Sequence, residues 1–341
     1  MKAVRLHQYE QRPVVEEVPD PAISGPLDVI VRVGGAGLCR TDLHIYEGQW
    51  ADRSGVTLPY TLGHENAGWV EAVGAAVTNV APGDTVILHP LITCGLCRAC
   101  RAGDDMHCDN GAFPGIGQDG GMAEYLLTGA RACVKLDPSL QPADVAALAD
   151  AGLTAYHAVK KAAPHLYPGT KVAVIGAGGL GHIGIQSLKA LTPAEIIVVD
   201  RSEPALELAR SYGADHTVTA GGKQVDEVLG LTDGNGAEVV IDFVGERGAE
   251  TDSWQMTRRA GSHFVIGYGG TVQVPTIDII STERNVIGNL VGTYNDLAEL
   301  MTLAAQGKVK LHTRTYPLDA VNDAMDDLDA GRLQGRGILV P

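Results

Sequence analysis

A glycine-rich turn between an apolar strand and a helix is the feature that most constrains the fold of this chain. The segment "VAVIGAGGLGHIGIQ" places Gly176, Gly178 and Gly181 in the pattern G-x-G-x-x-G, directly after a strand-like run. In this pattern the first glycine permits a tight turn, the second lets the backbone approach a pyrophosphate, and the third allows close helix packing. Gly179 and Leu180 complete the turn, where the helix N-terminus offers unpaired N–H groups to phosphates.

The next strand supports a dinucleotide site at this turn. The run "EIIVVD" ends at Asp200, where a carboxylate can accept hydrogen bonds from the ribose hydroxyls of a nicotinamide dinucleotide. A glycine-rich turn without a ligand is the alternative, but the strand, the turn, the helix and the acidic residue follow one another in the order that a dinucleotide site requires. Asp200 would repel a 2′-phosphate and therefore favours NAD over NADP, whereas the adjacent Arg201 favours the opposite choice.

A change in the pattern of apolar runs along the chain predicts two domains. From residue 171 short apolar runs alternate with helical patterns, which is typical of βαβ units and predicts a doubly wound parallel sheet of the Rossmann type. Residues 1 to about 150 instead show strand-like runs separated by Gly and Pro turns, which predict an antiparallel, barrel-like β domain. A closing strand, "GRGILVP", returns to the first domain. We expect one domain from residues 1–152 with 292–341 and the other from residues 153–291.

Four of the six cysteines lie in the segment "CGLCRACRAGDDMHC". Such spacing lets four thiolates converge on one small ion, and disulfides rarely persist in a reducing compartment. The sequence therefore predicts a closed, structural zinc site without an open position for substrate. An iron–sulfur cluster and a set of cysteines without metal are the alternatives. The predicted ligands are Cys94, Cys97, Cys100 and Cys108.

Charge and hydropathy exclude several kinds of partner. The chain of 341 residues has 41 acidic and 26 basic residues and a net charge of −15, without a basic run, so nucleic acid is not an expected partner. No apolar run reaches the ~18 residues of a membrane span. The opening segment lacks the pattern of a signal peptide, and we expect a cytoplasmic protein.

A second group of candidate metal ligands is spread along the chain. Cys39, His64 and Asp150 would supply one sulfur, one nitrogen and one oxygen to zinc and leave its fourth position open. Taken singly, each has an ordinary interpretation as a buried thiol, a turn histidine or a charge on a helix surface. Their long separations do not decide between these interpretations.

Five segments in order, "GLCRTDLHIYEG", "LGHENAGWVEAVG", the cysteine array, "AGLTAYHAV" and "GAGGLGHIGIQ", resemble the zinc-dependent medium-chain alcohol dehydrogenases. The resemblance covers essentially the whole chain. It implies a GroES-like β barrel, a Rossmann domain, and a catalytic zinc in the cleft between them. It also implies that Cys39 and His64 are zinc ligands, that Asp150 is the third, that Glu65 lies near the zinc and transiently binds it, and that Asp42 orients the ligating histidine.

The same resemblance assigns further roles. Thr41 would hydrogen-bond the alcohol and His44 would complete a proton path to solvent; an N-cap threonine and an ordinary surface histidine are the alternatives. Arg336 falls where an arginine meets the pyrophosphate. The residues expected to wall or hydrogen-bond the nicotinamide are Thr154, Val244, Ile266 and Tyr268.

These features predict an NAD-dependent alcohol dehydrogenase with two zinc ions per chain, which interconverts an alcohol with an aldehyde or ketone. A polyol or amino-alcohol dehydrogenase of the same superfamily and a non-catalytic zinc- and dinucleotide-binding redox sensor are the alternatives. Members of the family are dimers or tetramers, and the segment 284–292 is a candidate for strand pairing between subunits. Apolar residues that would line a pocket for simple aliphatic or aryl alcohols are Tyr46, Trp50, Phe113 and Leu290.

Overall fold

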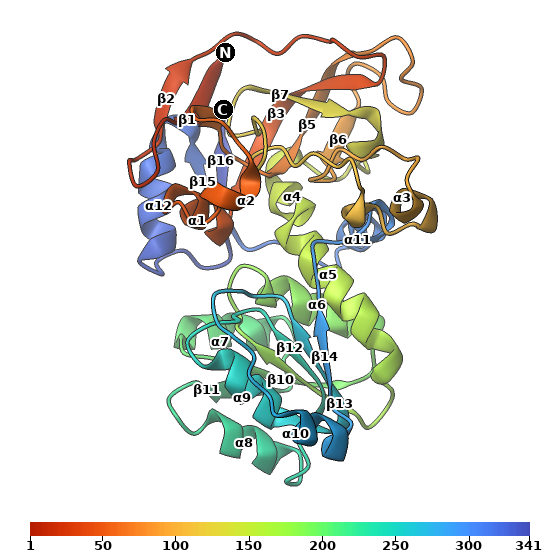
Figure 1. Cartoon of the computed structure of the whole chain (residues 1–341), viewed down its shortest axis with the longest axis vertical. Helices are drawn as coiled ribbons and strands as arrows, with labels where there is room; N and C mark the ends of the chain where they lie inside the picture. The colour runs from red at the N-terminus through yellow and green to blue at the C-terminus, as the bar shows by residue number, and fades with distance from the viewer. The chain divides into compact units, whose positions relative to one another are not determined.

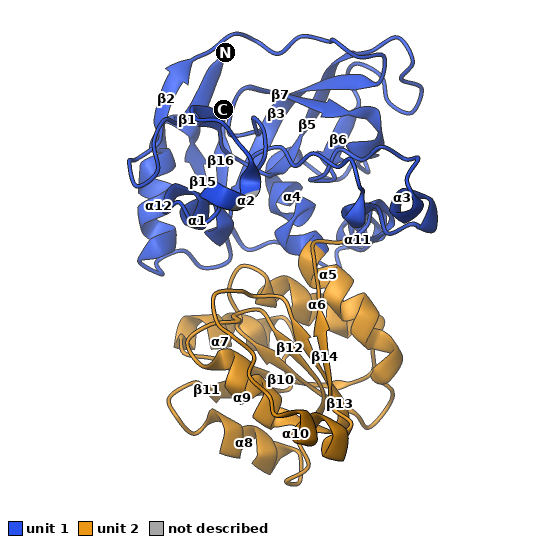
Figure 2. Cartoon of the chain, in the orientation of Figure 1, with its two compact units in different colours: residues 1–153, 293–341 blue, residues 154–292 orange. Residues whose placement is uncertain are grey.

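The chain divides into two compact units. The computed structural model describes residues 1–341, apart from the side chain of Arg53. Unit 1 comprises Met1–Leu153 and Thr293–Pro341, and unit 2 comprises Thr154–Gly292 (Figure 2). Both chain termini therefore lie in unit 1 (Figure 1).

Unit 2 is built on one six-stranded parallel sheet with the strand order β11-β10-β9-β12-β13-β14. Numbered from the first strand of the unit, this order is 3-2-1-4-5-6, which defines the Rossmann fold and confirms the predicted fold class. The strands are β9 (Lys171–Ile175), β10 (Glu195–Asp200), β11 (His216–Thr219), β12 (Ala237–Asp242), β13 (Thr257–Val265) and β14 (Asn285–Gly288).

Apolar side chains cover both faces of this sheet because successive residues of a strand point to opposite sides. In β9, Val172 and Val174 belong to one buried cluster, whereas Ala173 and Ile175 belong to the other. Near-continuous apolar strands such as these are typical of a sheet covered by helices on both faces. Most of α5 (Ala151–Ala162) belongs to this unit. The helices that lie wholly within it are α6 (Gly181–Leu191), α7 (Glu203–Ser211), α8 (Gln224–Leu231), α9 (Ala249–Met256) and α10 (Thr276–Thr282).

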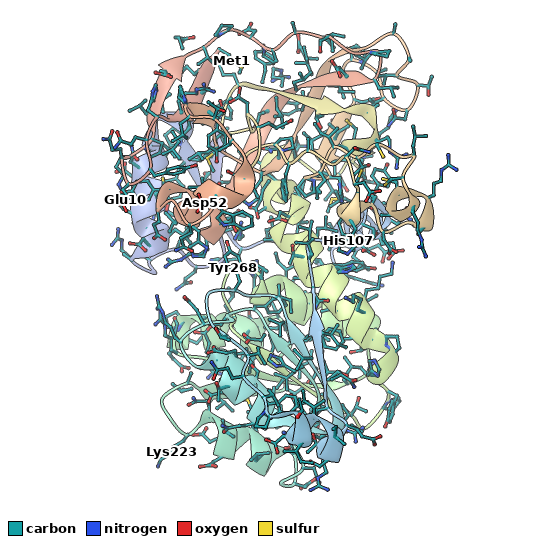
Figure 3. All side chains as sticks on the ribbon, in the orientation of Figure 1. Met1, Glu10, Asp52, His107, Lys223 and Tyr268 are labelled. Carbon is teal, nitrogen blue, oxygen red and sulfur yellow. The ribbon has the colours of Figure 1, made fainter. Side chains whose placement is uncertain are left out.

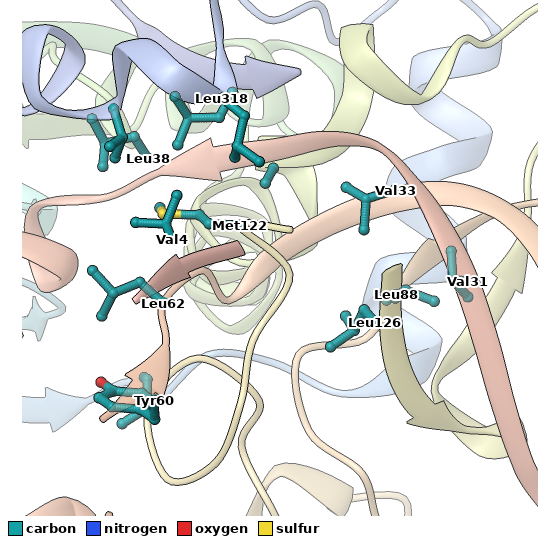
Figure 4. Close-up of a cluster of buried hydrophobic side chains, with 14 of the residues drawn as sticks. Val4, Val31, Val33, Leu38, Tyr60, Leu62, Leu88, Met122, Leu126 and Leu318 are labelled. Carbon is teal, nitrogen blue, oxygen red and sulfur yellow. The ribbon is translucent and has the colours of Figure 1, made fainter. Parts of the chain in front are cut away.

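Unit 1 is mainly antiparallel. A seven-stranded sheet has the order β15-β16-β3-β5-β6-β8, with β7 also paired to β3, and a three-stranded sheet has the order β2-β1-β4. Strands from both sheets bury their apolar side chains in one core (Figure 4). The strands are β1 (Lys2–Leu6), β2 (Val14–Glu17), β3 (Asp28–Leu38), β4 (Tyr60–Thr61), β5 (Glu65–Val73), β6 (Thr85–Leu88), β7 (Tyr125–Gly129), β8 (Cys133–Lys135), β15 (Thr313–Pro317) and β16 (Arg336–Val340).

The last segment of the chain completes unit 1. Strand β16 pairs antiparallel with β3, as the predicted return of the closing strand requires, and it pairs parallel with β15, which the sequence pattern did not indicate. Helices α11 (Tyr294–Ala305) and α12 (Val321–Asp329) precede it. Asp327 of α12 accepts hydrogen bonds from Arg314, Arg332 and the hydroxyl of Tyr316, each at 2.8 Å.

The segment on either side of residue 150 is helical in the structure but is not one continuous helix. It forms α4 (Pro142–Val145), a 3-10 turn η3 (Ala146–Ala149) and α5 (Ala151–Ala162). Asp150 lies at the break with φ −127° and ψ −60°. The break is explained by a side chain from elsewhere, because the backbone N–H of Ala151 donates to Oε1 of Glu65 at 3.0 Å. No helix in the described part of the chain has the length and apolar character needed to cross a bilayer.

Candidate functional site

Four potential metal ligands from different parts of unit 1 converge on one point. The ligand atoms of Cys39, His64, Glu65 and Asp150 all lie within 4.8 Å of one another. Cys39 is the N-cap of α1 (Arg40–Tyr46), Glu65 begins β5, and Asp150 precedes α5. Sulfur, nitrogen and carboxylate oxygen are all established zinc donors, so the set fits zinc chemically.

His64 is held at the centre of this group by two carboxylates. Its Nδ1 atom lies 3.3 Å from Oδ1 of Asp42, and its Nε2 atom lies 3.4 Å from Oδ2 of Asp150. Asp42 is itself fixed because its Oδ2 atom accepts from the backbone N–H of Cys39 at 2.8 Å. Neither ring nitrogen has a well-formed hydrogen bond to any described residue, although the side chain is only 1% exposed. A histidine oriented by one carboxylate with its other nitrogen toward a donor set is the arrangement of a metal ligand.

The electrostatics of the group also favour a cation. Burial lowers the pKa of His64, but Asp42 and Asp150 oppose it and raise that pKa well above its ordinary value. Burial raises the pKa of Glu65, although Arg336 opposes the shift. A buried concentration of carboxylates is stabilised by positive charge, which a divalent metal ion supplies.

Arg336 supplies a positive charge to the group from the last strand. Its guanidinium is 4% exposed and forms an ion pair with Oε2 of the fully buried Glu65. Gly37 makes room for this carboxylate, since a Cβ atom at Gly37 would lie 2.1 Å from Oε2. The predicted contact of Arg336 with a pyrophosphate stays a prediction. Sequence reasoning missed both the partner of Arg336 and the role of Gly37, for which no local spacing gave a signal.

The predicted proton-transfer residues lie on the helix that follows Cys39. Thr41 and His44 are half-buried on α1, which begins directly after Cys39.

Of the residues predicted to line the substrate pocket, Phe113 lies against the donor group. Its ring meets the ring of His64 edge-on, with centroids 6.1 Å apart and an interplanar angle of 86°. Tyr46, Trp50 and Phe113 pack against the apolar core of unit 1. Leu290, the fourth residue predicted for the pocket, belongs to unit 2 and is 52% exposed.

The four-cysteine segment forms a second potential metal site in unit 1. The sulfur atoms of Cys94, Cys97, Cys100 and Cys108 lie within 4.8 Å of one another, and all are free thiols. The N–H groups of Leu96 and Cys97 each lie 3.4 Å from Sγ of Cys94. These N–H groups lower the pKa of Cys94 to about 6. Burial instead raises the pKa of Cys100 to about 12, so a cation is needed to hold all four sulfurs as thiolates.

Cys133, the cysteine for which no ligand role was predicted, lies apart from both groups. It is 2% exposed and belongs to the apolar core of unit 1. Burial raises the pKa of its thiol to about 12, so the side chain stays neutral.

In unit 2 the three glycines have the geometry that the motif requires. Gly176 has φ +91°, and a Cβ atom at Gly181 would lie 1.9 Å from the carbonyl oxygen of Gly176. A Cβ atom at Gly178 would meet no atom within 4 Å, so this position faces open space. Asp200 is fixed beside the turn because its Oδ2 atom accepts from the N–H of Ala177 at 2.7 Å. A closed turn with one open glycine and an adjacent carboxylate fits a dinucleotide.

The predicted nicotinamide-contacting residues lie on three segments of unit 2. Val244 lies against the glycine turn, since a Cβ atom at Gly176 would lie 2.8 Å from its Cγ2 atom. Ile266 and Tyr268 lie in the loop that follows β13. Tyr268, labelled in Figure 3, has a side chain that is 43% exposed. Thr154 lies on α5.

The remaining residues predicted for the dinucleotide lie near the glycine turn and the second strand. Gly179 and Leu180 directly precede α6, and Arg201 is exposed after β10.

A Rossmann sheet with a glycine turn, together with an S, N, O donor group and a four-thiol group, defines the class of metal-dependent dinucleotide-binding dehydrogenases. Two family models match the chain. Residues 25–138 match the alcohol dehydrogenase GroES-like domain, and residues 179–306 match the zinc-binding dehydrogenase domain. The chain belongs to the zinc-binding alcohol dehydrogenase family and is an oxidoreductase.

Known relatives span the whole chain. An NAD-dependent alcohol dehydrogenase from Sulfurisphaera tokodaii is 36% identical over 350 residues, covering 100% of both chains. A D-arabinose 1-dehydrogenase (NADP(+)) from Saccharolobus solfataricus is 36% identical over 346 residues, covering 100% of this chain and 97% of its own. The crystal structure of the alcohol dehydrogenase from the archaeon Aeropyrum pernix has a TM-score of 0.97 and 48% identity, with 100% coverage of both chains.

Proposed function

We propose that this protein interconverts primary or secondary alcohols with aldehydes or ketones, using zinc at the Cys39 group and NAD at the glycine turn. The observation that carries the proposal is the convergence of Cys39, His64, Glu65 and Asp150 on one point. A bound metal ion explains why four side chains of metal-binding types converge at one position in the interior. The second metal group, with four thiols and no further donor, is proposed as a structural zinc site.

When bound at these two sites, zinc would supply Lewis acidity to an alcohol oxygen and NAD would accept its hydride. Cys39, His64 and Asp150 are the proposed ligands, and Asp42 fixes the orientation of the histidine ring. Thr41 accepts a hydrogen bond from the substrate hydroxyl, and His44 carries the released proton toward solvent. Glu65 lies beside the ligands, bound to Arg336, and would release one of its hydrogen-bond partners to bind the metal transiently.

The test of this proposal concerns Asp150, the ligand with the least local sequence support. In Asp150→Asn we expect kcat/KM to fall at least about a hundredfold, about 2.7 kcal/mol of lost transition-state stabilisation. One zinc ion should leave more readily to a chelator, while the four-cysteine zinc remains. Asp144→Asn is the matched control, because Asp144 is exposed on α4 and outside the donor group. Near-normal turnover and full zinc content in Asp150→Asn would indicate that Glu65, and not Asp150, is the third ligand. Loss of one zinc ion in the double variant Asp150→Asn with Glu65→Gln would then confirm that assignment.

The proposed substrates are simple aliphatic or aryl alcohols. Phe113 lies edge-on to His64, Tyr46 is the last residue of α1, and Trp50 follows α1 in the chain. Aromatic surroundings favour an apolar substrate over one with many hydroxyl groups, which need hydrogen-bond partners. A sugar or polyol is the second candidate, favoured by the name of the D-arabinose 1-dehydrogenase relative. Initial rates with primary, secondary and aryl alcohols, and with polyols and D-arabinose, decide between them.

The proposed cofactor preference is NAD over NADP. Asp200 lies fixed beside the glycine turn, where its charge opposes a 2′-phosphate. We expect at least about a tenfold preference in kcat/KM, the effect of about 1.4 kcal/mol. Asp200→Ala should narrow the difference. Better use of NADP by the wild type would show that Arg201 determines the preference.

We further propose that the protein forms a homodimer or homotetramer through β14. This edge strand pairs with β13 on one side, and the nearby helix α10 has no buried residue. An exposed edge beside an apolar surface favours pairing with a second copy of the chain. Analytical ultracentrifugation of the wild type and of a variant with charged residues in α10 tests this. Exposed apolar residues here are Ile277, Ile279, Ile280, Val286 and Leu290.

The proposed location is the cytoplasm. Four thiols that lie within reach of one another stay reduced and metal-binding only where disulfides do not form readily. Cell fractionation with an antibody against the native protein tests this location.

A further inference from the structure

A buried pair of polar side chains in unit 2 has no role in the chemistry described above. Asp242, the last residue of β12, and His263, in β13, are both 0% exposed. Nε2 of His263 lies 3.8 Å from Oδ2 of Asp242, slightly beyond hydrogen-bond length. Neither imidazole nitrogen, nor Oδ2, has a hydrogen-bond partner among the described residues. Fully buried polar atoms without partners destabilise a fold, so their presence calls for a function.

The other atoms of Asp242 connect two loops at the carboxyl ends of the strands. Its Oδ1 atom accepts from the N–H groups of Val244 and Gly245, each at 2.9 Å. Its backbone carbonyl accepts from the N–H groups of Ile266 and Gly267, each at 3.0 Å. One residue therefore determines the position of both loops, 243–245 and 266–268.

These two loops meet backbone to backbone. A Cβ atom at Gly245 would lie 2.0 Å from the carbonyl oxygen of Gly267, and a Cβ atom at Gly267 would lie 2.3 Å from the carbonyl carbon of Val244. Such tight contact lets a small rotation of the Asp242 carboxylate shift both loops together. Ligands of open parallel sheets bind at this edge, outside the carboxyl ends of the strands.

We propose that His263 and Asp242 form a positioning pair that sets these two loops for the nicotinamide half of the dinucleotide. The inference rests on the proposed use of NAD. In the dry interior of the sheet, an imidazole N–H directed at a carboxylate is attractive even at this separation. His263 thereby fixes the orientation of the Asp242 carboxylate, and Asp242 fixes Val244, Gly245, Ile266 and Gly267. Neither residue is proposed to touch the cofactor.

The experiment compares NAD with ADP-ribose, which lacks the nicotinamide, by calorimetric titration of the full-length protein. In His263→Phe, a change of similar shape, we expect the Kd for NAD to rise at least about fivefold and that for ADP-ribose by less than about twofold. Asp242→Asn should have the same effect, and the double variant should be no worse than either single one because the two act as a unit. His263→Gln keeps an N–H donor and should recover part of the affinity.

The matched control is Phe264→Leu, because Phe264 neighbours His263 in β13 but packs in the cluster on the opposite face of the sheet. It should lower Tm and leave the Kd for NAD unchanged. Wild-type affinity for NAD in His263→Phe, or an equal loss for NAD and ADP-ribose, would overturn the inference. A wild type that binds neither molecule would overturn the proposed function itself, and this inference with it.

Discussion

Glu65 and Arg336 lie 271 positions apart in the sequence and form an ion pair in the interior of unit 1. Glu65 begins β5 next to His64, and Arg336 begins β16. Both side chains are 4% exposed or less. The pair therefore connects the proposed catalytic metal group to the final strand of the chain.

Breaking this pair should destabilise unit 1. In Arg336→Met the carboxylate of Glu65 stays buried without its partner, so we expect a loss of about 3–5 kcal/mol in the free energy of unfolding. Adding Glu65→Gln should recover part of that loss. Urea denaturation measures both. Arg314→Met, which removes an exposed partner of Asp327, is the control and should cost no more than about 1 kcal/mol. An Arg336→Met protein as stable as the wild type would contradict the prediction.

The four-cysteine group should determine folding rather than turnover. In Cys97→Ser we expect one zinc ion instead of two by metal analysis, and a lower Tm, because structural zinc contributes directly to folding. Cys133→Ser changes a buried cysteine outside the group and should keep both ions. Two ions retained in Cys97→Ser would count against the site.

Two glycines of the same turn should respond differently to alanine. In Gly181→Ala the added methyl collides with the carbonyl of Gly176, so we expect a large fall in Tm. In Gly178→Ala the added methyl group points into open space, so the protein should fold normally. The methyl group would lie where the dinucleotide approaches the backbone, so the affinity for NAD should fall. Thermal melts and NAD titrations of both variants separate the two effects. Unchanged NAD affinity in Gly178→Ala would place the pyrophosphate elsewhere.

The Asp327 network should make unit 1 sensitive to acid. Hydrogen bonds from Arg332 and then from Tyr316 hold the pKa of Asp327 below its ordinary value of 3.8. A lowered pKa in the folded state stabilises the protein above that ordinary value, and the stabilisation is lost as the pH falls further. Asp327→Asn should therefore have a lower Tm than the wild type at neutral pH, and the two Tm values should converge below 3.8. A difference in Tm that stays constant through this range would contradict the assignment.

Local patterns in the sequence predicted those features that depend on neighbouring residues. The turn at Gly176 and the acid at Asp200 follow from backbone geometry within one βαβ unit, which the structure reproduces. Contacts between distant segments gave no such signal. The break before Ala151 depends on Glu65, and the space at Gly37 depends on the same carboxylate. Neither is visible until the chain is folded, because only tertiary packing brings those segments together.

The position of β16 has a consequence for biosynthesis. A ribosome releases all of unit 2 before residues 336–340, so the last residues of β3, Ala36 to Leu38, lack the partner strand β16 while the Rossmann sheet is already able to form. Domains usually fold as units in the order of their synthesis, but here the inserted unit is complete before the unit that surrounds it. During translation, the β3 edge near Leu38 is the segment most in need of protection from aggregation.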